Sequence, residues 1–253
     1  MVLRFFIFAV AFLISCTSEE RDSVCDEKSV YYNGCVGGVS SSSGGNVPSS
    51  SSKSASHPSY ITHSDPVPYG DQIYQTVFIG TQIWMTTNLN YNKSGSKCYG
   101  EGIGGVSADS IAKNCERYGR LYNWETARAA CPDGWHLPSD AEWEELVNYV
   151  GYSTVAAGTQ LKAESGWNSD DDNGQDWYGF AAMPGGYGTA DGIFAGEGYY
   201  AGWWSNTASE SSRAYHRSIL SRTSGNDNTI INKGSYEKSS LCSVRCVKND
   251  YYY

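Results

Sequence analysis

The sequence lacks the short patterns that build common metal and catalytic sites. Its four histidines are scattered and no two cysteines form a Cys-x-x-Cys pair, so the ligand spacing of a zinc site is missing. No Gly-x-Ser-x-Gly turn or His-Glu-x-x-His motif occurs, and the Ser, His and Asp residues are too scattered to nominate a catalytic triad. We therefore expect neither an assembled catalytic group nor a cofactor.

Positive charge and long apolar runs are also scarce. The chain of 253 residues has 18 Lys and Arg against 27 Asp and Glu, which gives a net charge of −9. This acidic balance argues against nucleic-acid binding and against electrostatic docking on anionic lipid. Beyond the N-terminus, no apolar run approaches the roughly 20 residues that a membrane-spanning helix needs.

The N-terminus has the form of an export leader. Arg4 supplies one positive charge, residues 5–14 form a short apolar run, and Leu13 stands three residues before Cys16. This pattern resembles a lipobox, where a peptidase cleaves before a cysteine that carries diacylglycerol. We predict a lipoprotein signal peptide at 1–15, membrane attachment through lipid on Cys16, and a location in the cell envelope, at the outer membrane or cell surface. An ordinary secretory signal with an incidental cysteine is the alternative.

Composition divides the remaining chain into three parts. Residues 16–39 form a short cysteine-containing segment, and residues 40–69 are rich in serine and glycine and contain four prolines. Such a composition cannot bury enough apolar area to offset its chain entropy, so we predict a flexible linker at 40–69. We expect order from near Gln72, in one domain over 70–250.

The domain is dense in aromatic residues and glycine. The chain contains 20 Tyr, 8 Trp and 7 Phe among 28 Gly. This composition favours a core of aromatic rings bridged by glycine-rich loops. Alternating residues on either side of Gly80-Thr81 predict a hairpin, and alternation returns over 214–220 and 241–247, which we interpret as paired strands.

Two helices are predicted from their capping residues. Asn123 can cap a short helix over 124–130. Ser139 and Glu142 form a capping box for a second helix that Gly151 closes. Two short helices in a loop-rich antiparallel fold predict an α+β domain.

Seven cysteines remain after Cys16, so an oxidising compartment would leave one without a partner. Connectivity does not follow from sequence alone. The assignment that we adopt pairs Cys25 with Cys35, Cys98 with Cys115 and Cys131 with Cys246, and leaves Cys242 free.

Motifs along the domain resemble a known family. They are QIWM at 82–85, NL at 88–89, YGRLYNW at 118–124, CPDGWHLPS at 131–139, GF at 179–180, PGGY at 184–187, WS at 204–205 and SVRCV at 243–247. In this order, over about residues 70 to 250, they are similar to the Fibrobacter succinogenes major paralogous domain. Export with a serine-rich tether also fits members of that family.

The block LPSDAEWE at 137–144 more distantly resembles the formylglycine-generating enzyme family. That family's fold is a variant of the C-type lectin fold, which implies a loop-rich domain with a small antiparallel sheet. Its members bind copper with two cysteines near the C-terminus, a role that the resemblance would assign to Cys242 and Cys246. Here three residues separate the pair, against four in the family, so we expect Cys246 to be a disulfide partner.

The acidic stretch 170–176 contains calcium-type ligands. Asp170, Asp172 and Asp176 supply carboxylates, but the stretch lacks the glycine and the glutamate of an EF-hand loop. The Glu-Pro-Asn and Gln-Pro-Asp triplets of calcium-dependent lectins are also missing. We expect a solvated turn and no metal, with calcium as the alternative.

Aromatic side chains are the remaining candidates for ligand binding. Eight of them crowd a glycine-rich region that we interpret as surface loops: Trp167, Trp177, Tyr178, Tyr187, Tyr199, Tyr200, Trp203 and Trp204. Such rings stack on sugars or anchor protein interfaces. We assign Trp135, Trp143 and Trp204 to the core. The predicted ligand-binding residues are Tyr199, Tyr200 and Trp203.

These features together predict an exported, lipid-anchored, non-catalytic surface protein that binds a polysaccharide or an envelope protein. Two alternatives stay open. One is an oxidase of the formylglycine-generating type that uses Cys242 and Cys246, which a disulfide between Cys131 and Cys246 would exclude. The other is a purely structural envelope protein.

Overall fold

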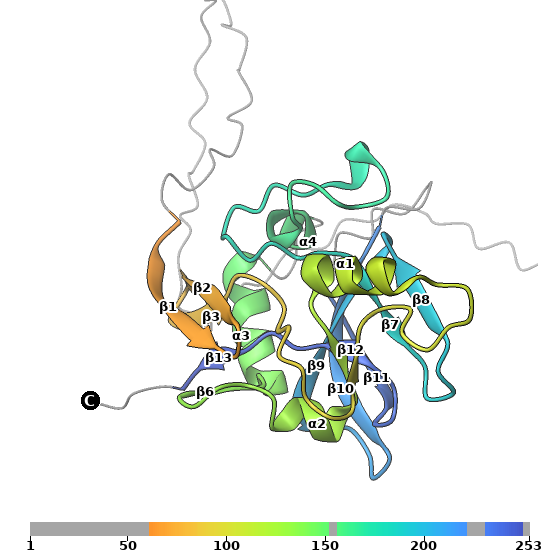
Figure 1. The fold of residues 1–253 in the computed structure, drawn as a ribbon. Coiled ribbons are helices and arrows are strands. Elements are labelled where there is room, and N and C mark those ends of the chain that lie inside the picture. Colours follow the sequence, from red (N-terminus) through yellow and green to blue (C-terminus); the bar gives the residue numbers. More distant parts are fainter. Residues whose placement is uncertain (1–60, 152–155, 222–230, 250–253) are drawn as a thin grey trace, which may run out of the picture. The chain divides into compact units, whose positions relative to one another are not determined.

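Two mainly antiparallel β-sheets and several short helices make up the part of the chain that the computed structural model describes, residues 61–151, 156–221 and 231–249 (Figure 1). The arrangement confirms the predicted α+β class. No helix within these ranges is both long and apolar enough to cross a bilayer. The predicted leader at 1–15, the segment 16–39 and most of the predicted linker lie outside the described residues.

The first sheet is built around the predicted hairpin. β2 (Gln72–Ile79) and β3 (Gln82–Met85) pair antiparallel, with Ile79 opposite Gln82 across the Gly80-Thr81 turn. The hairpin prediction is therefore confirmed. The sheet has the order β1-β2-β3-β13-β6, in which the other strands are β1 (His63–Tyr69), β13 (Val247–Lys248) and β6 (Trp135–His136).

β1 lies inside the predicted linker and precedes the predicted start of order at Gln72. The strand contains Pro66 and Pro68 and forms one edge of the sheet. Proline cannot donate a ladder hydrogen bond, but an edge strand tolerates it because one side of the strand needs no partner. The linker prediction for 40–69 is thus wrong over 63–69, where a proline-containing sequence forms an edge strand.

The second sheet has the order β11-β10-β9-β12-β5-β4, and β7 and β8 join it beside β9. The strand predicted at 214–220 is confirmed as β10. The segment 241–247 instead contributes β12 to this sheet and begins β13 of the other, so the two segments do not pair with each other. The strand bounds are β4 (Ser96–Lys97), β5 (Leu121–Tyr122), β7 (Gly185–Gly188), β8 (Phe194–Glu197), β9 (Tyr200–Ala208), β10 (Arg213–Leu220), β11 (Asn232–Glu237) and β12 (Cys242–Ser243).

Both predicted helices are present. α2 (Trp124–Arg128) is capped by Asn123 and ends two residues earlier than predicted. In α3 (Asp140–Val150), the Ser139 N–H donates to Glu142 Oε2 at 2.7 Å and the Glu142 N–H donates to Ser139 Oγ at 3.3 Å. These two bonds confirm the capping box, and Gly151 closes the helix in the left-handed conformation.

Further helical segments correct the prediction of two helices. They are α1 (Ala108–Tyr118), α4 (Ala156–Leu161) and the 3₁₀ turn η1 (Asp170–Asp172). In α1 only Cys115 and Tyr118 are buried, and with Ile111 they repeat at i, i+4 and i+7 along one face of the helix. Capping by Ser107 and the disulfide through Cys115 also hold the helix.

Two aromatic cores lie on opposite faces of the same strands. Trp84 of β3 and Trp203 of β9 join α3 residue Trp143 in the first core. Their neighbours Met85 and Trp204 belong to the second core. Successive side chains of a strand point to opposite faces, so each pair divides between the two cores.

The tryptophan assignments are confirmed at three positions and wrong at a fourth. Trp135, Trp143 and Trp204 are buried, as expected for core residues. Trp203, predicted to contact ligand, is only 1% exposed. Its indole N–H donates to Asn88 Oδ1 at 2.8 Å, so the strand that was expected to be a surface loop is buried on both faces.

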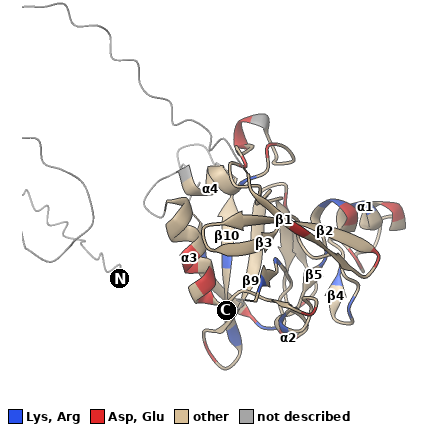
Figure 2. Ribbon diagram, turned by 90° about the vertical axis from the view of Figure 1, so that its left-hand side faces the viewer, with Lys and Arg blue, Asp and Glu red and all other residues tan. Residues whose placement is uncertain are grey.

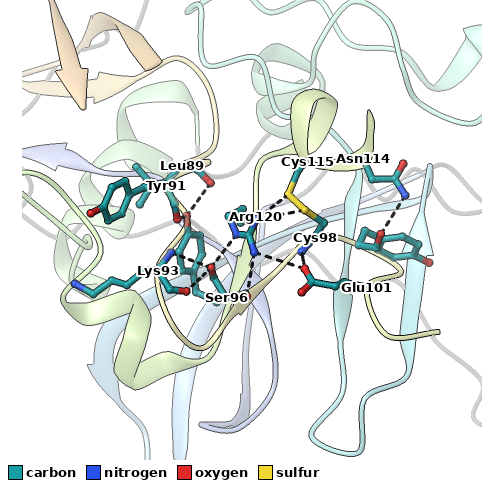
Figure 3. Close-up of a disulfide and its surroundings, with 11 residues drawn as sticks. Leu89, Tyr91, Lys93, Ser96, Cys98, Glu101, Asn114, Cys115 and Arg120 are labelled. Carbon is teal, nitrogen blue, oxygen red and sulfur yellow. Dashed lines mark hydrogen bonds and ion pairs between the residues drawn. A yellow bond between two sulfur atoms is a disulfide. The ribbon is translucent and has the colours of Figure 1, made fainter. Parts of the chain in front are cut away.

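The disulfides match the predicted pairing where the structure describes the cysteines. Cys98 bonds Cys115, Cys131 bonds Cys246, and Cys242 is a buried free thiol. The predicted pair of Cys25 and Cys35 lies outside the described residues. Figure 3 shows the guanidinium of Arg120 beside the first disulfide, where it also donates to Ser96 and forms an ion pair with Glu101.

Candidate ligand-binding groove

A groove of about 410 Å³ opens where the β2–β3 turn, the end of α3 and the loop 176–181 meet. Four of its lining residues are aromatic and none is charged. Neither β2 nor β3 carries a charged residue, in contrast to α1 and α3 (Figure 2). The lining residues are Ile61, Thr62, Phe78, Gly80, Tyr149, Trp177 and Tyr178.

Phe78 and Tyr149 reach the groove through the periodicity of their elements. Val77 and Ile79 enter the first core, so Phe78 between them points to the other face of β2 and is 42% exposed. On α3 the buried side chains include Val147 and Val150, which leaves Tyr149 on the exposed side at 57% exposure. Both rings are therefore presented by rigid, well-packed elements.

Gly80 allows the ring of Tyr149 to lie against the hairpin turn. Its φ of +63° is in the left-handed region, which favours glycine. A Cβ atom at Gly80 would lie 3.0 Å from Cδ2 of Tyr149. Because Gly80 has no side chain, the Tyr149 ring can lie directly against the turn, and this contact forms one wall of the groove.

The ring of Tyr178 stands edge-on to that of Tyr149. Their centroids are 5.9 Å apart and their planes are inclined by 66°, a favourable geometry for two aromatic rings. Burial raises the pKa of Tyr178, and the neighbouring Tyr149 adds to the effect. The Tyr178 hydroxyl therefore stays neutral at ordinary pH, available as a hydrogen-bonding group.

Trp177 and Tyr178 belong to a loop that is tied down on both sides. The Trp177 N–H donates to Gln160 O at 2.9 Å, and the Ala182 N–H donates to Leu161 O at 2.8 Å. Within the loop, Phe180 is fully buried in the first core. The loop thus places two aromatic residues in the groove while one of its own side chains anchors it from within.

The polar side-chain groups in the lining of the groove are hydroxyls and the indole N–H. The lining contains no carboxylate, imidazole, amine or thiol, the groups that most often perform proton transfer or nucleophilic attack. Uncharged aromatic surfaces accompanied by hydroxyl groups can stack against a sugar ring or an apolar side chain and hydrogen-bond at its edge.

The comparisons with known proteins identify the family. The family model of the Fibrobacter succinogenes major domain matches residues 77–248, most of the described chain. The chain belongs to this family. No curated protein and no solved structure matches the chain. Within the Fibrobacter succinogenes major domain lie all groove residues except Ile61 and Thr62, which precede the matched region.

The predicted ligand-binding residues do not form one surface. Tyr199 is 51% exposed beside the start of β9, whereas Tyr200 is half-buried and Trp203 lies in the core. None of the three lines the groove. Trp177 and Tyr178 are among the aromatic residues that crowd the glycine-rich region of the sequence. Phe78 and Tyr149 lie outside that region, and their exposure depends on which face of each element is buried.

Tyr200 belongs to a cluster of rings that pack on one another. The Tyr187 ring lies 5.2 Å from Tyr200 and 5.5 Å from Tyr236, and Tyr236 stacks on His216 at 4.0 Å. The Tyr236 hydroxyl donates to that of Tyr200 at 3.3 Å. These rings pack against each other, and two of their hydroxyls are hydrogen-bonded to each other. The cluster therefore offers less free aromatic surface than the groove.

The acidic stretch does not converge on a cation. Asp172 accepts a hydrogen bond from the Ser221 hydroxyl, while Asp176 Oδ1 accepts one from the Ala181 N–H at 2.7 Å. Asp170 lies in η1. Across the described residues, no group of three or more His, Cys, Asp and Glu side chains is arranged to hold a metal ion.

The cysteine pair required for the oxidase alternative is not a pair of thiols. Cys246 forms a disulfide with Cys131, the bond that was expected to exclude the oxidase alternative. Cys242 is fully buried, and burial raises the pKa of its thiol far above the usual range. The thiolate that would bind copper is strongly disfavoured there, so this alternative is wrong.

Proposed function

We propose that this member of the Fibrobacter succinogenes major domain family is an exported, lipid-anchored, non-catalytic surface protein that binds polysaccharide. The observation that carries the proposal is the groove, which is lined by four aromatic residues and by no charged residue. Aromatic faces supply apolar contact to the C–H face of a sugar, and hydroxyl groups at Thr62, Tyr149 and Tyr178 match its polar edge.

The uncharged lining favours a neutral polysaccharide over one rich in carboxylates or sulfates. A charged ligand would lose hydration in an apolar groove without gaining a charged partner there. The net charge of −9 adds a general repulsion against acidic polymers. A protein partner is a different class of ligand, and the binding experiment below separates the two.

Export and anchoring are supported by the leader at 1–15 and by Cys16. Metabolic labelling with a fatty-acid analogue tests this part. The wild-type chain should incorporate the label and fractionate with membranes, whereas Cys16→Ser should do neither. Label on the Cys16→Ser variant, or none on the wild type, would disprove lipid attachment at this residue.

We also propose that the fold is a C-type-lectin-like variant of the formylglycine-generating type. What supports it is the combination of short antiparallel strands, long glycine-rich loops and two helices of 11 residues around aromatic cores. The resemblance of the block at 137–144 points in the same direction. An experimental structure compared with that fold tests the proposal, which fails if the strand order differs from its sheet.

Binding to an array of neutral and acidic polysaccharides, with calcium and with chelator, tests the main proposal on the full chain. We expect saturable binding to neutral polysaccharides that chelator leaves unchanged. Tyr149→Ala should weaken it about tenfold, because one aromatic contact contributes about 1.5 kcal/mol.

Tyr199→Ala is the matched control for this test. Tyr199 is 51% exposed against 57% for Tyr149, but it lies outside the groove. Its substitution should leave binding unchanged. Loss of binding in this control alone would place the site at the β9 loop. Failure to bind any polysaccharide would overturn the proposal in favour of a protein partner or a structural role.

A further inference from the structure

The loop that carries Trp177 and Tyr178 begins and ends in an unfavourable backbone conformation. Asp176 has a φ of +41° and Ala181 a φ of +48°, the two non-glycine residues of the described chain in the left-handed region. Such residues cost free energy and persist only when their surroundings hold them in place. Strain at both ends of one short loop therefore requires a specific restraint.

The Asp176 carboxylate supplies that restraint by joining the two strained residues. Its Oδ1 accepts the Ala181 N–H at 2.7 Å, a bond that closes the loop from end to end. Gly179, between them, has a φ of +68° and approaches Ile61 so closely that a Cβ atom would lie 3.0 Å from its Cγ2. The loop is thus closed by one side chain and pressed against the wall of the groove.

A buried cation holds the same loop from the core side. Arg245 is fully buried, donates to Phe180 O, and lies with its guanidinium carbon 4.3 Å from the centre of the Phe180 ring. Its other donors bind Asn88 Oδ1 and Met85 O at 2.7 and 3.1 Å, so the guanidinium is fixed. The charged groups that face Asp176 are Arg245, whose attraction favours the carboxylate, and Glu164, which opposes it.

We propose that Asp176 is a positioning residue: by closing the loop 176–181 it holds Trp177 and Tyr178 in the geometry that forms the groove. The ligand named in this inference rests on the proposed function, whereas the role of Asp176 in holding the loop does not. It assigns a role to a carboxylate that touches no ligand and that the sequence suggested only as a calcium candidate.

The positioning role has a consequence for pH. Burial raises the pKa of Asp176 to about 6, although the Ala181 N–H and the Arg245 charge lower it. Below that pH the neutral carboxyl is a weaker acceptor and no longer attracts Arg245. None of the groove-lining residues changes charge between pH 5 and 7.5 on its ordinary pKa, so a change in affinity there reports on groups outside the lining.

Two variants separate the charge of Asp176 from its acceptor atom. Asp176→Asn keeps an oxygen for the Ala181 N–H but cannot ionise, so it mimics the protonated form. Asp176→Ala removes the acceptor altogether. A charge-assisted hydrogen bond is roughly twice as strong as a neutral one. At pH 7.5 we therefore expect Asp176→Asn to lower the affinity about fivefold and Asp176→Ala to lower it more.

The probes are glucomannan, xyloglucan and mixed-linkage β-glucan, each titrated with the full chain at several pH values from 5 to 7.5. Wild-type affinity should fall about fivefold toward acid pH. Asp176→Asn should be flat at the acid level of the wild type, and Asp176→Ala should be weaker throughout. A wild-type profile that is flat, or one that Asp176→Asn leaves unchanged, overturns the positioning role.

A measurement without ligand keeps this inference distinct from the proposed function. The chain is labelled with 5-fluorotryptophan, and the ¹⁹F resonance of Trp177 is assigned with Trp177→Phe. We expect that resonance to titrate near pH 6 in the wild type and not in Asp176→Asn. If it does so while no polysaccharide binds, the loop is positioned as inferred and the proposed function is wrong. If the resonance is the same in wild type and Asp176→Ala, the positioning role is wrong.

Discussion

His216 is a buried imidazole in a site that disfavours its charge. It stacks on Tyr236, and its Nδ1 has no hydrogen-bond partner in the described part of the chain. Burial and, to a smaller extent, the charge of Arg213 lower the pKa of His216 from 6.5 to about 4. The native state therefore holds this residue neutral over a range in which the unfolded state takes up a proton.

The sign of the resulting pH dependence follows from linkage. Between pH 6.5 and about 4 the unfolded chain binds the proton of His216 and the folded chain does not, so the free energy of unfolding decreases as the pH is lowered through this range. The full contribution is about 3 kcal/mol. Urea unfolding of wild type and His216→Phe at pH 7.5 and 4.5 measures it. The difference between the two proteins should shift in favour of the variant at acid pH, and an unchanged difference would contradict the prediction.

Truncation of Trp203 should lower stability far more than truncation of Tyr199, although both residues were predicted to contact ligand. Trp203→Ala removes a core indole and leaves Asn88 Oδ1 without one donor, so we expect it to lower the free energy of unfolding by about 3 to 5 kcal/mol. Tyr199→Ala, at an exposed site, should change it by less than about 0.5 kcal/mol. Urea unfolding at one pH compares them, and equal effects would mean that β9 is not packed as described.

The error at Trp203 shows what single residues in a sequence leave undetermined. Adjacent tryptophans on a strand face opposite sides, so one exposed face is the usual expectation. β9 instead has a core on each face, a property of its neighbours and not of its own sequence. By contrast, Ser139 and Glu142 were predictable because their capping contacts are made three residues apart.

At the scale of elements, the β2–β3 turn should be as important for the groove as its aromatic residues. Gly80→Ala imposes a side chain on a left-handed residue and pushes against Tyr149. Gly192→Ala is a matched control, because Gly192 has a φ of +88° and nothing within 4 Å of the added atom. Both variants should lose about 1 kcal/mol of unfolding free energy from backbone strain.

Polysaccharide binding distinguishes the two glycine variants. We expect Gly80→Ala to weaken it, because the Tyr149 ring must move, and Gly192→Ala to leave it unchanged. Titration of both with the same neutral polysaccharide measures the effect. Equal affinities would show that the Tyr149 position does not matter for binding.

Most of the predicted elements carry local signals, whereas elements that depend on distant contacts were missed. The β2–β3 hairpin and α3 were predicted because a turn and a capping box lie within the element. β1 was missed because it is a proline-containing edge strand that depends on its partner, whereas α1 was missed although the Ser107 cap and the spacing of Cys115 and Tyr118 are local signals. The groove could not be predicted for the same reason as β1, since it combines a hairpin, the end of a helix and a loop that are far apart in sequence.

At the scale of the whole molecule, the C-terminal segment joins the two sheets. β12 lies between β9 and β5 of one sheet, and β13 lies between β3 and β6 of the other. The residues between them include Arg245, which binds β3 and the groove loop, and Cys246, which binds Cys131. The family motif SVRCV thus has a structural explanation as the connection between sheets.

This connection makes the two disulfides unequal. Cys131–Cys246 joins residues 115 apart and Cys98–Cys115 joins residues 17 apart. The chain-entropy model assigns the longer loop about 2 kcal/mol more stabilisation, because its closure restricts the unfolded chain more. We therefore expect the double variant Cys131→Ala/Cys246→Ala to lose more unfolding free energy in urea than Cys98→Ala/Cys115→Ala. The difference between the two losses should also exceed the value that chain entropy alone gives, because the Cys131–Cys246 bond lies where the two sheets meet. Equal losses would show that the sheets hold together through packing and Arg245 alone.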